Sequence, residues 1–507
     1  MKLVTVAQIR EVDRHAIEDL GIPGTTLMSN AAEQIAKVAM EHIPPGGSAT
    51  IFCGTGNNGG DGIGAAAYLI EKGIPVRIFL IGDHANLTPD SKEMEKRLNS
   101  LGGSLEQFSM SFDLDNHMDN CDVVIDAIFG IGLNSDLKGD VLSAVSVINS
   151  SKAFVISADI PSGVHADTGV ILGDAVKADI TVTFSLAKPG HFVEPGCLSC
   201  GELRVCDIGI PRDALDAIIS HMYAAMPGDM YLPRRRRDSH KGNYGRTLIV
   251  GGSIGYTGAP ALSARAATRM GAGLVYLGVP NLIYEIIAAK LDEEMPFPLP
   301  GDSNGQLIAN AASDILRRVG QSDVCLIGPG LGTSKDISEL VQSITRIAET
   351  PLVLDADGLN AIAEDLDILD NAVCPLILTP HAGEFERLGG DLSSGDRIRA
   401  SCDFATKHGC ILVLKGHRTI VALPNGIAYV NTTGGPAMAK GGSGDVLAGM
   451  IAALIAQKLP IVHAIASAVY IHGLAGDMCA AEYGEYSVTA SDLIAMLPKA
   501  MKEIETF

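Results

Sequence analysis

The sequence predicts an α/β protein made of two doubly wound domains, and three observations predict it. Short apolar stretches run repeatedly into glycine-rich or acidic turns that open helical segments, which is the pattern of parallel strands joined by helices. The composition combines 57 glycines with only 5% aromatic residues, which suits many tight turns. At 507 residues the chain exceeds what one hydrophobic core usually holds. We expect a three-layer α/β sandwich at 1–225 and a second doubly wound domain at 226–507.

The net charge of −21 limits the classes of partner that the surface favours. A strongly acidic protein repels nucleic acid and anionic membrane, so we expect neither as a main partner. No hydrophobic run reaches membrane-spanning length and no signal peptide precedes Met1, so we expect the reduced cytoplasm. Of the ten cysteines only Cys197 and Cys200 have a metal-like spacing, and no second pair completes a zinc site.

The N-terminal half opens with helical periodicity over 4–40 and a short apolar strand at 49–53. The strand runs into the glycine-rich stretch 54–62, which we expect to be a turn before a helix that starts at Ile63. Strand, glycine turn and helix together can cradle a phosphate. The stretch is neither the GxGxxG fingerprint nor a Walker loop, and its two adjacent asparagines add amide groups that favour a ligand-binding role.

Three aspartates of this half, Asp61, Asp126 and Asp159, are expected just past the ends of strands. The carboxyl ends of parallel strands meet at one edge of a sheet, where ligands bind. Asp126, Ser162 and the amide oxygen of Asn58 offer hard oxygen ligands to a monovalent or divalent cation, which leaves Asp159 for acid–base chemistry. Taken singly, each aspartate is commonly a cap or turn residue. The strands are expected at 76–81, 122–126, 153–157, 178–184 and 203–208.

Two turn-rich segments follow. The stretch Lys188 to His191 is expected to be a tight turn. The segment between Asp213 and Gly245 is expected to link two domains, because it is rich in proline and holds four consecutive arginines at 234–237. Such a run is usually a solvated segment, and a minor role in attracting phosphate stays open.

The second half repeats units of strand, loop and helix. Gly251 to Pro260 follows the first of these strands and opens a helix at 261–270. The strands end in polar or glycine loops, which places one binding edge at their carboxyl ends. They are expected at 247–250, 274–279, 323–327, 352–354, 376–378 and 411–414.

A glycine-rich turn at 434–445 opens an apolar helix, and Asp445 lies at its end. A helix start with Gly441, Gly442 and Gly444 presents free N–H donors and a partial positive charge, so it forms an anion site. A carboxylate binds phosphate poorly, so we expect Asp445 to take a proton from a hydroxyl that attacks phosphorus. An ordinary helix N-cap is the alternative.

Four further residues end strands at the same edge. Lys415, Arg418 and Thr419 offer positive charge and a hydroxyl to a nucleotide phosphate. His381 is expected to orient a substrate hydroxyl or phosphate. Each of them alone is more often a solvated side chain, and their convergence on one edge favours binding.

The motifs resemble two known families over nearly the whole chain. The first half resembles the NAD(P)H-hydrate epimerase family, with a Rossmann-like fold, in Gly56–Gly62, Asp126–Gly132, Asp159–Gly163 and Ala178–Phe184. The second half resembles the ADP/ATP-dependent NAD(P)H-hydrate dehydratase family, with a ribokinase-like fold, in Gly251–Gly258, Gly328–Gly332, Thr379–Glu384, Lys415–Thr419 and Gly441–Asp445. The chain is therefore expected to be a bifunctional NAD(P)H-hydrate repair enzyme.

The resemblance implies a role for individual residues of both domains. It implies potassium at Asn58, Asp126 and Ser162, and substrate contact with proton transfer at Asp159. The hydrated dinucleotide is expected at Asn57, Asn58, Gly59, Gly60, Asp61, Gly130, Ile131, Gly132, Leu133, Asn134, Ser135 and Asp136. The adenine nucleotide is expected at Lys415, Gly416, His417, Arg418, Thr419 and Gly444, and the hydrate to be dehydrated at Ala259, Gly332, His381 and the catalytic Asp445.

The implied function is repair of a damaged cofactor. The first domain interconverts the R and S forms of NADHX and NADPHX, and the second dehydrates the S form at the expense of ADP or ATP, with magnesium accompanying the nucleotide. The metal motif Asn-x-x-Glu of sugar kinases appears here as His381-Ala-Gly-Glu384, so how magnesium is held stays open. Homo-oligomerisation is expected by analogy with the fold. The rival hypothesis is a small-molecule hydroxyl kinase of ribokinase type fused to a nucleotide-binding module.

Overall fold

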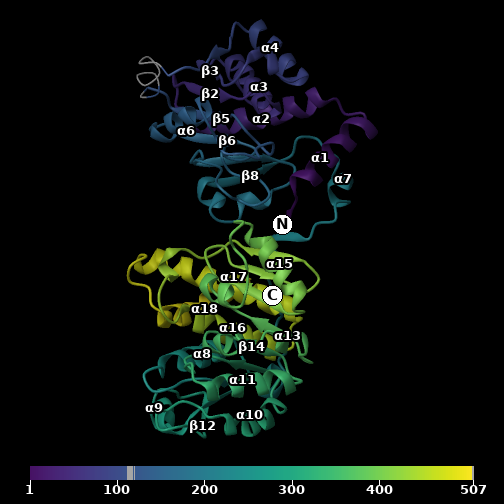
Figure 1. Cartoon of the computed structure of the whole chain (residues 1–507). Coiled ribbons are helices and arrows are strands. Elements are labelled where there is room, and N and C mark those ends of the chain that lie inside the picture. Colours follow the sequence, from purple (N-terminus) through teal and green to yellow (C-terminus); the bar gives the residue numbers. More distant parts are fainter. Residues whose placement is uncertain (111–117, 119, 505–507) are drawn as a thin grey trace. The chain divides into compact units, whose positions relative to one another are not determined.

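The computed structural model describes residues 1–110, 118 and 120–504 (Figure 1). These residues form two compact units, one of residues 2–222 and one that begins at Tyr223 and includes Met1. The division lies within the segment that was expected to link two domains. Each unit contains a largely parallel sheet with helices packed on it (Figure 1). The predicted α/β fold class is confirmed.

A parallel sheet forms the centre of the first unit. Its strands, in spatial order, are β4 (Glu106–Gln107), β3 (Val76–Leu80), β2 (Ala49–Cys53), β5 (Val123–Ala127), β6 (Phe154–Ala158), β7 (Ile180–Phe184) and β8 (Glu202–Cys206). The chain order reverses between β2 and β5, and such a switch point is where open parallel sheets bind ligands. Outside this sheet the unit has β1 (Lys2–Leu3), α1 (Val6–Arg14), α2 (Gly24–His42), α3 (Asn57–Glu71), α4 (Pro89–Ser100), α6 (Asp140–Ser150) and α7 (Arg212–Asp216).

Helix α3 starts at Asn57, six residues before the predicted start at Ile63. The glycines therefore lie in the first turns of the helix instead of in a loop. A Cβ atom on Gly59 would lie 1.8 Å from the carbonyl oxygen of Gly54, so glycine is needed there for close packing of helix on strand end. The prediction that three aspartates lie just past strand ends is corrected in part: Asp61 is helical and Asp126 lies inside β5, whereas Asp159 directly follows β6.

The sheet of the second unit is parallel over most of its width. Its strands, in spatial order, are β9 (Met222–Ala225), β18 (Ala428–Asn431), β17 (Ile420–Ala422), β16 (Ile411–Leu414), β15 (Leu376–Leu378), β14 (Leu352–Leu354), β13 (Val324–Ile327), β10 (Arg246–Val250), β11 (Leu274–Pro280) and β12 (Met295–Leu299). Strands β9, β12, β17 and β18 were not predicted. Two prolines interrupt β12, which a sheet tolerates at its edge, and β17 pairs antiparallel with both of its neighbours.

Two helices of the second unit are buried almost all round. Helix α16 (Ser443–Ala456) is buried from Val446 to its end and packs in the core with α17 (Ile461–Tyr483). The other helices are α8 (Gly258–Arg269), α9 (Tyr284–Ala288), α10 (Ala312–Val319), α11 (Lys335–Ile347), α12 (Asp357–Ile362), α13 (Asp367–Asp370), α14 (Ala382–Arg387), α15 (Arg397–Lys407) and α18 (Ala490–Ile504).

Helix α17 corrects the expectation that no run is long enough to span a membrane. Its 23 residues pass that test by length and composition, as one helix of the described chain. The structure buries 72% of its apolar window inside the unit, which is how a core helix satisfies the same test.

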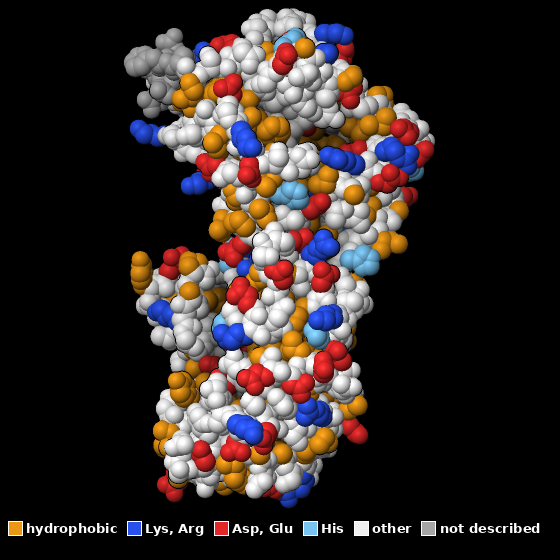
Figure 2. All heavy atoms as spheres, in the orientation of Figure 1, with side chains coloured by type: hydrophobic (Ala, Val, Ile, Leu, Met, Phe, Trp, Pro, Cys, Tyr) orange, Lys and Arg blue, Asp and Glu red, His pale blue; other side chains and the backbone are white. Residues whose placement is uncertain are grey.

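Charged side chains of both signs are mixed on the face shown in Figure 2. Lys and Arg side chains lie among Asp and Glu there instead of gathering into one basic surface. This distribution agrees with the acidic net charge of −21.

Candidate functional site

Adjacent strands of the first unit bring its predicted residues to one sheet edge. Asn58 and Asp61 follow β2 in the first turns of α3, Asp126 lies near the end of β5, and Asp159 follows β6. Strands β2, β5, β6 and β7 are parallel neighbours, so their carboxyl ends point the same way. Lys188, which comes after β7, joins this edge although it was predicted only as part of a turn.

Asp159 is held by an ion pair with Lys188. The Lys188 Nζ atom lies 2.6 Å from Asp159 Oδ1, and only 2% of the Lys188 side chain is exposed. The hydroxyl of Thr183 donates to the same oxygen at 3.1 Å. Burial acts to raise the pKa of Asp159, but the Lys188 and His191 side chains outweigh it and hold the pKa below its usual range. Asp159 is therefore a carboxylate at neutral pH.

The backbone of Asp159 is in an unusual conformation. Its φ of +65° is rare for a residue with a side chain and is strained. The ring of His191 lies 2.8 Å from the Asp159 carbonyl oxygen, and the Ile131 N–H donates to Oδ2 at 3.3 Å. These contacts fix the carboxylate so that it faces the loop that begins at Gly130.

Two further carboxyl groups, those of Asp61 and Asp13, are influenced by the charges at Asp159 and Lys188. Burial and the charges of Asp159 and Asp13 raise the pKa of Asp61 well above its usual range. Burial also raises the pKa of Asp13, in α1, to about 6. Neither side chain makes a hydrogen bond or an ion pair with another described residue, so both can take part in proton transfer. Asp13 was missed, because one acidic residue in an amphipathic helix is no signal by itself.

The predicted cation ligands are only partly assembled. Asp126 accepts hydrogen bonds from Ser157 Oγ at 2.9 Å and from Ser162 Oγ at 2.6 Å, and burial raises the pKa of Asp126. All its partners among the described residues are neutral. Both amide atoms of Asn58 are buried without a described partner. A Cβ atom on Gly130 would lie 2.9 Å from Asp159 Oδ2 and 3.1 Å from Asn58 Oδ1, so these two side chains face the same glycine.

The predicted loop Gly130–Asp136 is divided between packing and exposure. Leu133 is buried in an apolar cluster with Phe52 and Ile128, so its side chain serves the core. Gly132 and residues 134–136 are exposed. The backbone of the loop, and not the Leu133 side chain, is what this unit presents at its sheet edge.

In the second unit Asp445 lies in the first turn of α16, beside a left-handed glycine. Gly442 caps the helix with a φ of +97°, a conformation that favours glycine. Ser263 donates its hydroxyl to the Asp445 backbone carbonyl at 2.9 Å, which fixes the turn. The Asp445 side chain has no hydrogen bond or ion pair with a described residue. Burial, followed by the negative charge of Asp355, raises the pKa of Asp445 to about 7, although the Lys415 charge acts the other way.

Lys415 lies against the same turn. A Cβ atom on Gly444 would lie 3.4 Å from Lys415 Nζ. The ammonium pairs with Asp355 Oδ1 at 2.7 Å and lies 3.7 Å from Glu384 Oε2. Burial acts to lower the pKa of Lys415, but these two carboxylates outweigh it and raise the pKa. Lys415 therefore stays charged beside the helix start, where an anion would bind.

The other predicted nucleotide residues brace their own loop. Arg418, at a φ of +60°, donates from Nη1 to the Thr432 carbonyl at 2.5 Å. Thr419 is buried, and its hydroxyl donates to the Gly416 carbonyl at 3.0 Å. The structure thus brings Lys415 and Gly444 together, whereas the Arg418 and Thr419 side chains are engaged within the loop.

The residues predicted to hold the hydrate line nearby strand ends. His381 caps α14, accepting from the Glu384 N–H at 3.2 Å, and 56% of its side chain is exposed. The Gly332 N–H donates to Asp357 Oδ2 at 2.8 Å. Ala259 lies in the first turn of α8, 3.5 Å from the position of a Cβ atom on Gly330. All three lie at loops or helix starts beyond β10, β13 and β15.

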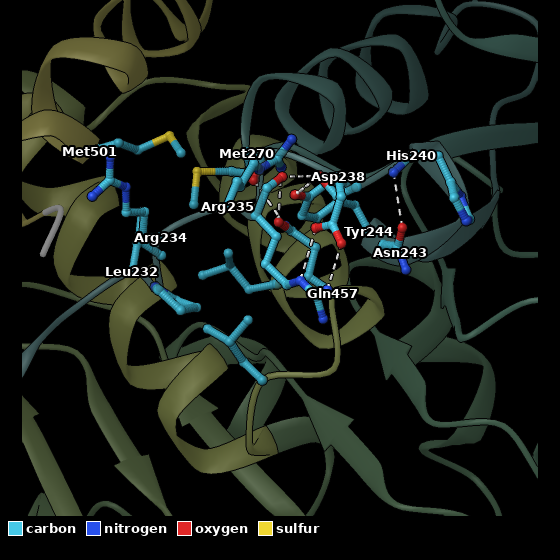
Figure 3. A pocket seen from close by; sticks show the side chains of 15 residues that line it. Leu232, Arg234, Arg235, Asp238, His240, Asn243, Tyr244, Met270, Gln457 and Met501 are labelled. Atoms are coloured by element: carbon cyan, nitrogen blue, oxygen red, sulfur yellow. Dashed lines mark hydrogen bonds and ion pairs between the residues drawn. The ribbon is translucent and has the colours of Figure 1, made fainter. Parts of the chain in front are cut away.

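The four-arginine run lies far from this edge. Figure 3 shows Arg234 and Arg235 in a cavity of about 610 Å³ that Met270 and Gln457 also line. Arg235 donates to Gln457 Oε1 at 3.0 Å, and Gln457 follows the last residue of α16. Asp445 lies in the first turn of the same helix, about 18 Å away at about 1.5 Å per residue. Arg235 therefore binds at the end of α16 that lies opposite to Asp445, and the structure lends no support to a role of the run in attracting phosphate.

Comparisons with known proteins agree with this division of the chain. A family model described as NAD(P)H-hydrate dehydratase matches residues 247–499, and one described as YjeF-related protein N-terminus matches residues 24–190. A ribokinase-like superfamily protein from Enterococcus faecalis V583 has a crystal structure similar to the second unit. It is 29% identical, with a TM-score of 0.50, over 57% of this chain and 98% of that chain. The second unit therefore belongs to the ribokinase-like class of α/β proteins.

Relatives along the full length define the family more narrowly. The chain is 39% identical to the bifunctional NAD(P)H-hydrate repair enzyme Nnr of Thermofilum pendens, over 99% of this chain and 97% of that relative. It is 38% identical to the enzyme of the same name from Moorella thermoacetica, over 100% of this chain and 97% of that relative. The chain belongs to the family of bifunctional NAD(P)H-hydrate repair enzymes, as predicted.

Proposed function

We propose that this chain repairs hydrated NADH and NADPH in two steps. The domain at 1–225 interconverts the R and S forms, and the domain at 226–507 dehydrates the S form at the expense of ADP or ATP. One observation carries the second step: the unpaired Asp445 carboxyl lies in the first turn of α16, beside Gly444 and the Lys415 ammonium. This arrangement supports a proton acceptor next to an anion site.

Dehydration begins with removal of a proton from the hydroxyl at C6 of the damaged ring. Asp445, with a pKa of about 7, is suited to accept that proton at neutral pH. The oxygen then attacks the terminal phosphorus of the nucleotide, and the helix start and Lys415 stabilise the charge on the transferred group. The C6–O bond breaks as the lone pair of the ring nitrogen pushes phosphate out, and loss of a proton from C5 restores NADH or NADPH.

Phosphorylation explains why a kinase fold performs a dehydration. Hydroxide is a poor leaving group and phosphate a good one, so the nucleotide supplies the driving force for loss of oxygen. We assign the nucleotide to Lys415–Thr419 and Gly444. We assign the hydrate to Ala259, Gly332, His381 and Asp445. Magnesium, as the nucleotide's companion, supplies charge neutralisation to the phosphates.

Epimerisation requires the C6 hydroxyl to leave and return on the other face of the ring. A proton must be given to the leaving oxygen and then taken from the entering water. Asp159, held ionised by Lys188, is the acceptor. Asp61 is the donor, because burial and the charge of Asp159 raise its pKa and so favour its protonated form. We assign the hydrated dinucleotide to Asn57–Asp61 and to the loop Gly130–Asp136.

A monovalent cation fits the first unit in donor type and charge. Asp126 is a buried carboxyl with only neutral described partners, and the amide oxygen of Asn58 is buried without one. Potassium, held by Asn58, Asp126 and Ser162, would supply the positive charge that this group of oxygens lacks. We further propose cytoplasmic action on free dinucleotides and self-association of the chain.

The decisive experiment mixes the full chain with both epimers of NADHX and either ADP or ATP. We expect both epimers to be consumed, with NADH and free phosphate appearing in equal amounts on chromatography. A stable phosphorylated dinucleotide would instead support the rival hydroxyl kinase. Consumption of the S form alone would show that the first unit is a binding module.

A further inference from the structure

Two buried carboxylates and a partly buried lysine meet at the ends of three neighbouring parallel strands of the second unit. Asp355 directly follows β14, Glu384 lies in the first turn of α14 after β15, and Lys415 directly follows β16. The Lys415 Nζ atom lies 2.7 Å from Asp355 Oδ1 and 3.7 Å from Glu384 Oε2. The exposed fractions of the two carboxylate side chains are 2% and 8%. The ammonium therefore occupies the point on which both carboxylates converge.

Neutral donors orient both carboxylates independently of the lysine. The Thr379 hydroxyl donates to Asp355 Oδ1 at 2.7 Å. The His381 backbone N–H donates to Glu384 Oε2 at 2.8 Å. Two buried carboxylates fixed toward one point are the usual beginning of a site for a hard divalent cation. Here a side chain of the protein supplies the positive charge instead.

We infer that the Lys415 ammonium replaces a protein-bound divalent cation, so that magnesium reaches this site only as part of the nucleotide complex. Magnesium needs oxygen ligands at about 2.0–2.1 Å in octahedral geometry, and the Nζ atom fills the space that such an ion would occupy beside Asp355. Among the described residues no group of three or more His, Cys, Asp or Glu side chains is arranged to hold a metal ion. The described residues of the second unit therefore form no magnesium cage made of protein ligands alone.

The inference deepens the proposed function, since it concerns how the nucleotide brings its metal to the same edge. The ammonium also lies beside Gly444, where the transferred phosphate is expected. A tethered charge there stays in place between turnovers. It keeps the carboxylates neutralised before the nucleotide arrives, whereas a free metal ion would have to bind first.

The test measures binding of Mn²⁺, a paramagnetic substitute for Mg²⁺, to the nucleotide-free full chain in potassium buffer. Electron paramagnetic resonance counts the free Mn²⁺ directly. For the unsubstituted chain we expect binding weaker than about 1 mM, the weak limit of carboxylate sites, and no change on Asp355→Asn. For Lys415→Met we expect binding at least about tenfold tighter, because the substitution leaves two oriented carboxylates without a cation.

Two matched variants make the result specific. Lys335→Met removes an exposed lysine that lies 3.5 Å from Glu339 on α11, and it should leave Mn²⁺ binding unchanged. Adding Asp355→Asn to Lys415→Met should abolish the gained site. Circular dichroism of each variant reports whether its fold is retained.

Either of two outcomes overturns the inference. One is that the unsubstituted chain binds Mn²⁺ more tightly than about 1 mM and Asp355→Asn removes that binding, which would mean that the lysine yields to the metal. The other is a folded Lys415→Met variant that gains no site. The first comparison needs no lysine variant, so the inference stays testable if that variant does not fold. No turnover is measured, so a failure of the proposed repair activity would appear separately in the dinucleotide assay.

Discussion

Both units pair a lysine with an aspartate at a sheet edge, a buried lysine in the first unit and a partly buried one in the second, but the pairs leave different residues free. In the first unit Lys188 contacts Asp159, the proposed proton carrier, and holds its pKa below the usual range. In the second unit Lys415 contacts Asp355, while Asp445 has no described partner and its pKa rises to about 7. The Lys188–Asp159 pair therefore keeps the candidate base Asp159 ionised at neutral pH. The Lys415–Asp355 pair leaves the candidate base Asp445 unpaired, with a pKa close to neutral pH.

This difference suits the two reactions. A kinase-like step needs a base that gains a proton and releases it at neutral pH, which a pKa near 7 provides. An epimerase must give a proton and take one within a single cycle, which suits an ionised Asp159 beside an Asp61 whose pKa is raised. We therefore propose that the choice of the aspartate that pairs with the lysine distinguishes the chemistry of the two units.

The largest expected effect comes from Asp445→Asn. Because no other described carboxyl is unpaired at that helix start, we expect nucleotide-dependent recovery of NADH absorbance to fall by about 10³-fold or more. Epimerisation should be unchanged. Asp403→Asn, at an exposed carboxylate on α15, is the matched control. Near-normal dehydration by Asp445→Asn would show that Asp445 is not the base of the second unit.

Asp159→Asn should give the reverse pattern with a smaller loss. We expect epimerisation to slow by about 10²-fold, less than the loss above, because Asp61 and Asp13 remain nearby to exchange protons. Dehydration of pure S epimer should be retained. Chromatography of the two epimers over time measures the rate, with Asp140→Asn as control. Equal loss of both activities would mean that the two sites are not independent.

The pH dependence of the two activities should also differ. Asp445 acts as a base only when ionised, so kcat/KM for dehydration should fall about tenfold per pH unit below its pKa of about 7. Asp159 is ionised throughout that range because its pKa is lowered. Its ionisation should therefore cause no such fall in kcat/KM for epimerisation. Parallel pH profiles of the two activities test this. A dehydration rate that is flat from pH 5 to pH 8, roughly one to two units on either side of that value, would contradict the assignment.

The smallest expected effect is on stability, and it should differ between two glycines of the second site. Gly442 has a φ of +97°, and a Cβ atom there would lie 2.8 Å from Leu262, so Gly442→Ala should lower the free energy of unfolding by about 1–3 kcal/mol. Gly444 is helical, and its Cβ would make an ordinary 3.4 Å contact with Lys415, so Gly444→Ala should change that free energy by less than about 1 kcal/mol. Urea unfolding followed by circular dichroism compares them. Equal losses would mean that Gly442 is not required by its backbone conformation.

Much of the fold could be predicted from apolar runs that end in glycine or acidic residues. Parallel strands such as β14 and β16 are buried on both faces and therefore appear as continuous apolar stretches. The antiparallel strands β17 and β18 are short, and β12 carries two prolines, so none of them has such a run. The start of α3 was misplaced because glycine is read as a turn former, whereas here it allows close packing.

The candidate site could be located in the sequence where it depends on a local motif. Asp445 and the nearby Gly442 and Gly444 are close together in the chain, so their combination is visible without the structure. Lys188 and Asp13 act through residues far away in the chain, so neither stands out from an ordinary turn lysine or a helix aspartate. The choice of Asp355 as the partner of Lys415 likewise depends on which strands are neighbours, which only the sheet order reveals.

The contact between α3 and β2 affects how the sequences of relatives that have lost catalytic activity should be interpreted. The carbonyl of Gly54 leaves no room for a methyl group on Gly59, whether or not a dinucleotide ever binds there. A descendant that has lost catalysis should therefore keep this glycine for steric reasons while Asp159 and Lys188 drift. Retention of Gly59 and Gly60 in a relative then indicates only that the fold is intact. Retention of the Asp159–Lys188 ion pair is the better indication of an active isomerase.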